Sequence, residues 1–358
     1  MTTVADVVDA VAGVDTHADT LAVAIAARSG VVVAEAEFAA TGAGIEDLIG
    51  WVVERAPGPR LLFAVEGTRS YGIGLARAVA RLGLPVIELD RPSRAERRGR
   101  GKTDAIDAVL GARRALGLDA DALPTPRCDG DREALRILLL ARREMTADKT
   151  AKTNRLIAML RTGSDTDRDL VRAPLTAATL GRIARRRATT RESREDMIRR
   201  VEARRLATAL TALERDLRGN KKHLATLVED IAPGLTQRVG IGPVSAAQAI
   251  VSWSHPGRCR SEAAFANLAG AAPIPASSGR VTRHRLNRGG DRALNRALHD
   301  IAQTRMRCCP GTRAYAARRR AEGLSTKEIR RCLKRYIARE LHRALNAAMT
   351  PPTSTAAA

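Results

Sequence analysis

The chain has 358 residues, and its 61 Lys and Arg against 39 Asp and Glu give it a formal net charge of +22. A positive excess of this size is typical of proteins that bind a polyanion, most simply DNA or RNA. Aromatic residues make up 2% of the chain, which disfavours a surface that reads single strands by stacking bases on aromatic rings.

The composition also disfavours membrane and secreted proteins. No stretch approaches the roughly 18 consecutive apolar residues of a membrane span. Residues 1–12 lack the basic start and long apolar run of a signal peptide. The five cysteines are odd in number and scattered without the spacing of a metal site, which indicates a reducing compartment. We therefore expect a cytoplasmic protein with no membrane partner.

The first region, residues 1–120, is predicted to be an α/β domain with a mixed sheet. Three apolar runs within residues 10–40 are rich in β-branched residues and separated by turns, as expected of strands. Further along, strands alternate with amphipathic helices, which is typical of an α/β domain. The expected strands are residues 60–68 and 85–90, and the expected helices are residues 44–56, 71–83 and 103–117.

The second region, residues 121–232, is predicted to be helical and to mediate oligomerisation. Residues 119–130 contain two prolines and a glycine and are expected to be a linker, and a long helix is expected to end at Gly163. A later stretch has the a/d spacing of a coiled coil. The seam consists of Leu206, Leu210, Leu213, Leu217, Asn220, Leu224, Leu227 and Ile231.

Asn220 has two possible interpretations within this seam. A polar Asn at a seam position can fix the register and number of the paired helices. Alternatively, the Gly219–Asn220 pair ends one helix, because glycine is a common helix stop.

The third region, residues 233–348, is predicted to be a basic helical domain. Residues 280–343 contain 19 Lys and Arg but only 5 Asp and Glu. This segment therefore carries most of the net charge and is a candidate nucleic-acid surface. Residues 349–358 are expected to be a disordered tail.

Four acids are placed where they could bind metal. Asp15 ends the first predicted strand and Glu66 ends a later one, while Asp104 and Asp107 lie at i and i+3 on one helix face. Carboxylates grouped in this way would repel each other unless a cation lies among them. Their hard oxygen ligands suit Mg²⁺, and two such ions would stabilise both the attacking and the leaving oxygen of a phosphoryl transfer.

Simpler interpretations exist for each of these positions. An Asp at a strand end is often a turn residue, and Asp104 or the preceding Thr103 could cap its helix. His17 is a candidate for a further ligand or base, but a turn histidine is the more common case.

Three sets of residues are candidates for binding nucleic acid. Cations just before the acidic pair form the first set, and Gly240 and Gly242 form the second, because a glycine hairpin between helices exposes backbone N–H groups that can bind a phosphate. The third set follows two loop serines, Ser277 and Ser278. The cations of the first and third sets are Arg97, Arg98, Arg100 and Lys102, and Arg280, Arg283, Arg285, Arg288 and Arg292.

Several stretches together resemble one protein family. "GVDTHADT", "AVEGTRSYG", "GKTDAIDA", "GIGPVSA" and "FANLAGAAPIPASSG", followed by "LNRGGDRALNRAL", occur in this order along the chain. They resemble the insertion-sequence transposases of the IS110 type, which combine a DEDD domain with a catalytic serine and are related to the Piv invertases. The resemblance covers about residues 10–345.

The resemblance implies a fold and a mechanism. It implies an RNase-H-like, Holliday-resolvase-like first domain in which Asp15, Glu66, Asp104 and Asp107 bind Mg²⁺. It places the nucleophile at Ser278, the serine directly before glycine in the "PASSG" loop, although Ser277 lies beside it. Members of this family recombine donor and target DNA under the guidance of an element-encoded RNA and assemble as homodimers and homotetramers.

Two other functions remain open at the level of sequence. One is a metal-dependent, junction-type endonuclease, in which the acids activate water and the serine is incidental. The other is a nucleic-acid-binding scaffold without chemistry, which the basic third region would serve equally well.

Overall fold

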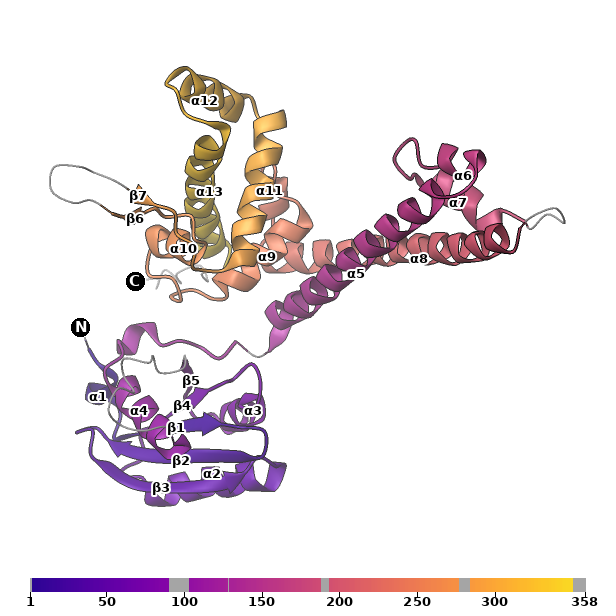
Figure 1. Cartoon of the computed structure of the whole chain (residues 1–358). Helices are drawn as coiled ribbons and strands as arrows, with labels where there is room; N and C mark the ends of the chain where they lie inside the picture. Colours follow the sequence, from indigo (N-terminus) through magenta and orange to yellow (C-terminus); the bar gives the residue numbers. More distant parts are fainter. Residues whose placement is uncertain (1, 90–102, 128, 188–192, 277–283, 350–358) are drawn as a thin grey trace. The chain divides into compact units, whose positions relative to one another are not determined.

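The computed structural model of the chain describes residues 2–89, 103–127, 129–187, 193–276 and 284–349 (Figure 1). It divides into two compact units, each described by itself. Unit 1 contains residues 1–133, 253–267 and 349–358, and unit 2 contains residues 134–252 and 268–348. Within the described parts, no helix has both the length and the apolar character needed to cross a membrane.

Unit 1 is built on a five-stranded mixed sheet, as predicted. The strand order is β3-β2-β1-β4-β5; β2 is antiparallel to β1 and β3, whereas β1, β4 and β5 run parallel. This is the arrangement expected of an RNase-H-like domain. The strands are β1 (Ala10–Thr16), β2 (Thr20–Ala27), β3 (Val32–Ala39), β4 (Leu61–Glu66) and β5 (Val86–Leu89).

Helices cover both faces of this sheet. Helices α2 (Gly42–Arg55) and α3 (Ile73–Arg81) pack on one face, where Phe63, Leu48 and Leu75 are fully buried. Helix α1 (Val4–Val7) and helix α4 (Asp104–Leu116) pack on the other face. The core of unit 1 thus lies in two layers, one on each side of the sheet.

The register of β1 and β4 brings two predicted ligands to one edge. Val14 pairs with Val65 across the parallel ladder, so Asp15 and Glu66 are the next residues of their strands. Because side chains alternate between the faces of a strand, both acids belong to the face that carries α4.

Gly13 in β1 allows α4 to lie directly on the strand. A Cβ at this position would be 2.3 Å from the carbonyl oxygen of Ala108 and 2.5 Å from the amide nitrogen of Ala112. Only glycine permits so close an approach of helix backbone to strand backbone. The close packing places the first turn of α4 beside the end of β1.

Unit 2 contains a hairpin of two long helices, α5 (Gly130–Arg161) and α8 (Arg194–Ile231). They run antiparallel, since Leu138 contacts Asn220 and Lys149 pairs with Glu214 at 3.0 Å. The short helices α6 (Asp165–Asp169) and α7 (Ala177–Arg185) lie between them in the chain, and α7 packs against both long helices in one apolar cluster.

Helix α8 continues without interruption through Gly219 and Asn220, so the interpretation that this pair ends a helix is wrong. Asn220 is buried, and its partner in the structure is α5 of the same chain. The seam residues Leu206, Leu210 and Leu224 are buried as well. The heptad pattern is therefore used at least in part within one subunit.

Among the described residues after α8, the secondary structure is mainly helical, with one small hairpin. Strands β6 (Ile274–Pro275) and β7 (His284–Arg285) pair antiparallel. Fully buried leucines and isoleucines of α11 and α13, among them Leu298, Ile301 and Leu341, supply apolar packing in unit 2. The helices are α9 (Pro243–Trp253), α10 (Glu262–Leu268), α11 (Arg292–Cys308), α12 (Pro310–Ala321) and α13 (Thr326–Met349).

Candidate functional site

Asp15 and Asp104 meet where β1 ends and α4 begins. Asp15 is the penultimate residue of β1, and its side chain is buried. Asp104 opens α4, while the hydroxyl oxygen of Thr103 accepts a hydrogen bond from the amide of Ile106 at 3.3 Å and caps the helix. Thr103 is thus the N-cap of α4, so the Asp104 carboxylate does not cap the helix.

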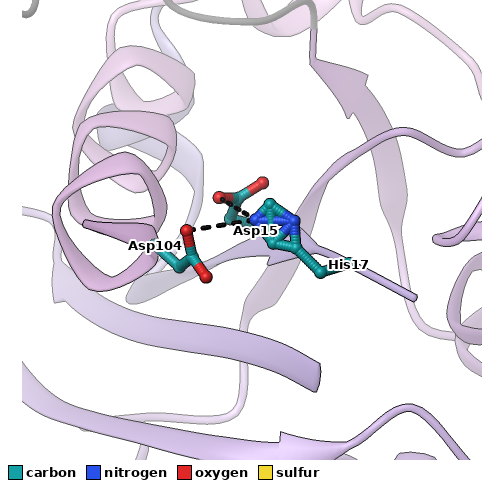
Figure 2. Close-up of side chains that lie close together, drawn as sticks. All are labelled: Asp15, His17 and Asp104. Carbon is teal, nitrogen blue, oxygen red and sulfur yellow. Dashed lines mark ion pairs between the residues drawn. The ribbon is translucent and has the colours of Figure 1, made fainter. Parts of the chain in front are cut away.

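His17 lies between these two carboxylates (Figure 2). Its Nε2 atom is 3.0 Å from Oδ1 of Asp104 and 3.6 Å from Oδ2 of Asp15. The turn is fixed by the backbone amide of His17, which donates a hydrogen bond to the carbonyl oxygen of Thr20 at 2.9 Å. The three side chains offer ligand atoms that all lie within 4.8 Å of one another.

The electrostatics of Asp15 link all four predicted acids to one place. Burial, followed by the negative charges of Glu66, Asp104 and Asp107, raises the pKa of Asp15 to about 6, against the opposing effect of His17. Glu66 and Asp107 also line one small cavity of unit 1. Burial together with nearby like charges raises pKa values mainly at functional sites, so Asp15 is a candidate functional residue.

These residues fit a divalent cation. Two carboxylates and an imidazole offer three ligand atoms close together, and further carboxylates act on the same point. A cation would remove the repulsion that raises the pKa of Asp15 and would satisfy the buried carboxylate. From the sequence, His17 was expected to be a turn histidine, because "DTH" after a strand has the pattern of an ordinary turn.

Several of the predicted site residues lie outside the residues that the structure describes. These are the serines Ser277 and Ser278 and the cations Arg97, Arg98, Arg100, Lys102, Arg280 and Arg283. Their assignments stay predictions.

Gly240 and Gly242 lie in the turn before α9, as the sequence suggested. Gly240 has a φ of +80°, and a Cβ there would be 2.9 Å from Cγ of Arg305, so the turn packs against α11. The amide of Gly242 donates to the hydroxyl oxygen of Ser245 at 3.1 Å. Both glycines line a groove of about 880 Å³ in unit 2 that also contains Arg143 and Arg296. Phosphate binding at this turn stays a prediction.

The remaining predicted cations are found on the segment from β7 to α11. Arg285 belongs to β7, while Arg288 and Arg292 line a pocket with four cations of α13. Those four, Lys327, Arg330, Arg331 and Lys334, were not singled out in the sequence. Their spacing of i, i+3, i+4 and i+7 is the signal that could have found them.

Comparisons with known proteins agree with this geometry. Residues 12–163 match the model of a family described as transposase, of the DEDD type found in IS110 elements. Residues 233–317 match the model of a family described as transposase IS116/IS110/IS902.

A curated relative comes from Streptomyces coelicolor, where it is described as the uncharacterized 43.6 kDa protein of insertion element IS110. It is 34% identical over 121 residues, which are 33% of this chain and 30% of the relative. The matching segment thus spans less than a third of the relative's length.

Proposed function

Since the chain belongs to the IS110 family of transposases, we propose that it cuts and rejoins DNA through a covalent link between a serine and a DNA phosphate. The group of Asp15, His17 and Asp104 carries this proposal, because it can bind a metal and lies at the end of the sheet in a DEDD domain. Glu66 and Asp107 complete the proposed site through their effect on Asp15.

The proposed reaction conserves the energy of the phosphodiester bond. The hydroxyl oxygen of Ser278 attacks a DNA phosphorus, and its proton passes to a carboxylate of the site or to water. The bond from phosphorus to one deoxyribose oxygen breaks, and this oxygen takes up a proton and leaves as a hydroxyl. A second deoxyribose hydroxyl later attacks the phosphoserine, which rejoins the DNA and frees the serine without net hydrolysis.

In this proposal the four acids share one task, and His17 has another. Asp15 and Asp104, with Glu66 and Asp107, hold Mg²⁺, and the donor set of mainly carboxylate oxygens suits this ion. When bound, a divalent cation supplies positive charge that stabilises negative charge developing on the phosphate. His17 holds the side chains of Asp15 and Asp104 together from the turn after β1.

Guidance by an element-encoded RNA is the further part of the proposal. A chain with a net charge of +22 and 2% aromatic residues is suited to binding nucleic-acid backbones rather than to reading bases. Sequence choice would then fall to base pairing by the RNA, as in other RNA-guided systems. We also propose that the protein acts in the cytoplasm as a homodimer or homotetramer on donor and target DNA.

Detection of the covalent protein–DNA intermediate tests this proposal. The full chain is incubated with Mg²⁺, guide RNA and end-labelled donor and target DNA, denatured, and run on a denaturing gel. A protein–DNA adduct is expected, and Ser278→Ala and Asp15→Asn should each abolish it. Ser277→Ala is the matched control and should retain it. Cleavage that persists in Ser278→Ala, without an adduct, would instead support the junction-type endonuclease.

A further inference from the structure

A pocket of about 280 Å³ in unit 2 is surrounded by positive charge. Six cationic side chains line it, and none of its lining residues among those described is an Asp or Glu. The cations are Arg288, Arg292, Lys327, Arg330, Arg331 and Lys334. All of its lining residues belong to unit 2, whereas the residues of the acidic site belong to unit 1.

Three segments of the chain contribute these cations. Helix α13 supplies four of them on one helix face, from Lys327 to Lys334. The first residue of α11 supplies Arg292, and the loop that follows β7 supplies Arg288. Like charges on one helix face destabilise a helix. Their concentration here therefore indicates a function other than folding.

Within the described ranges, no salt bridge joins any of the six cations to a carboxylate. The charge of Glu328 acts on Arg331 only at longer range. Lys334 donates a hydrogen bond from Nζ to Oδ1 of Asn295 at 2.9 Å. Burial, followed by the charges of Arg331, Arg330 and Arg292, lowers the pKa of Lys334. The pocket is therefore complementary to an anion with more than one charge.

The pocket wall is held in place by hydrogen bonds and close packing. Oδ1 of Asn287 accepts from the amide of Gly289 at 3.0 Å, and Nδ2 of Asn295 donates to the carbonyl oxygen of Ala269 at 2.7 Å. Gly270 has a φ of +62°, and a Cβ there would be 2.7 Å from the carbonyl oxygen of Gly289. A wall fixed in this way presents its cations in a defined geometry.

The amides at the N-terminus of α11 do not form the anion site. Oδ1 of Asp291 accepts from the amides of Ala293 and Leu294, both at 2.9 Å, so these two amides of the first turn are already bonded. Oδ2 of Asp291 accepts in turn from the hydroxyl of Ser252 at 2.6 Å. Side chains must therefore recognise the anion, and guanidinium groups match phosphate oxygens in pairs.

We propose that this pocket binds the phosphodiester backbone of DNA. The proposal rests on the proposed function for the choice of DNA. Six cations spread over a loop and two helices fit successive phosphates of a strand better than one small anion. In the sequence, β7 follows the predicted serine segment, and the loop that carries Arg288 follows β7.

The experiment measures DNA binding without catalysis. A fluorescein-labelled DNA duplex is titrated with the full chain in EDTA at several salt concentrations, and anisotropy gives Kd. Arg331→Gln and Lys327→Gln each remove an exposed cation that lines the pocket. Arg335→Gln is the matched control, because it removes an exposed cation of the same helix that does not line the pocket. Thermal melting confirms that each variant is folded.

Arg331→Gln and Lys327→Gln should each weaken binding about tenfold, as expected for loss of a hydrogen bond between two charged groups. Each should also reduce the slope of log K against log salt by about 0.9. Arg335→Gln should change neither. Equal losses of DNA affinity in all three variants, or no loss in the two pocket variants, would overturn the proposal that the pocket binds DNA.

A second arm uses RNA of the same sequence, and variants that lose RNA binding alone would overturn the choice of DNA. Failure of the proposed function would be seen separately, as absence of the protein–DNA adduct while the pocket variants still lose DNA binding.

Discussion

The imidazole of His17 joins the two carboxylates that begin the proposed metal site, with Nε2 3.0 Å from Asp104 and 3.6 Å from Asp15. This links the turn after β1 to the first turn of α4 (Figure 2). A neutral imidazole offers a ligand nitrogen, and a protonated one offers the positive charge that the acids lack. With a proton on Nε2 the imidazole can donate to a carboxylate, and without that proton the same nitrogen is available as a ligand to a cation.

Removal of this imidazole should weaken metal binding. We expect His17→Ala to lower the affinity for Mg²⁺ or Mn²⁺ by about 10- to 100-fold, the usual effect of losing a residue that orients metal ligands. Isothermal titration calorimetry on the full chain measures this. His223→Ala, which removes an exposed histidine of α8, is the control and should bind the metal as the wild type does. Equal affinity in both variants would contradict the assignment of His17.

The raised pKa of Asp15 predicts an unusual pH dependence without metal. Because the folded chain holds this proton up to about pH 6, whereas the unfolded chain releases it near 3.8, the folded state binds more protons between these values. The contribution of Asp15 to the free energy of unfolding therefore falls as pH rises through this window, by roughly 3 kcal/mol. Asp15→Asn should lack this decline.

Urea unfolding in EDTA at pH 4 and pH 7.5 measures the difference between the two proteins. Asp15→Asn should gain stability relative to the wild type at the higher pH, and Mg²⁺ should reverse the order by stabilising the wild type alone. Asp19→Asn removes an exposed acid of the same turn and serves as the control. A wild-type advantage at pH 7.5 in EDTA would contradict the prediction.

Gly13 should be essential for the position of α4. In Gly13→Ala the new Cβ would lie 2.3 Å from the Ala108 carbonyl oxygen, which forces α4 and its acids away from β1. We expect a loss of about 1–3 kcal/mol or more in the free energy of unfolding, as for other overpacked cores, and a loss of metal affinity.

Denaturant unfolding and calorimetry test the Gly13→Ala prediction together. Gly50→Ala is the matched control, since a Cβ at Gly50 in α2 meets nothing within 4 Å. Glycine in a helix interior is less favourable than alanine by about 1 kcal/mol, so this variant should be slightly more stable than the wild type. Unchanged metal affinity in Gly13→Ala would show that α4 does not need this contact.

The mixed sheet and its acidic edge could be predicted because the necessary signals are local. The runs that form β1 and β4 are apolar and each reaches an acid near its end, and parallel neighbours bring such ends together. The i, i+3 spacing of Asp104 and Asp107 then needed only a helix. His17 could not be separated from an ordinary turn histidine, because its contact with Asp104 depends on how closely α4 packs on Gly13.

The partner of α8 could not be predicted for a different reason. A heptad seam indicates that a helix packs against another helix, but it does not indicate which helix is the partner or whether that helix belongs to the same chain. In the structure α5 supplies part of that surface, through contacts of Leu138 and Arg142 with Asn220. Gly219 looked like a helix stop, but it is tolerated because packing of the flanking residues outweighs its low helix propensity.

Asn220 should therefore fix the register of α5 against α8. Its Nδ2 donates to the carbonyl oxygen of Leu138 at 2.9 Å, and its Oδ1 accepts from Nη1 of Arg142 at 3.3 Å. Asn220→Ala leaves these partly buried groups without this partner and should cost about 1–3 kcal/mol of the free energy of unfolding. Denaturant unfolding measures the loss, and Thr226→Ala, at an exposed position of the same helix, should change it by less than about 0.5 kcal/mol. Equal stability of both variants would show that the seam tolerates any residue at Asn220.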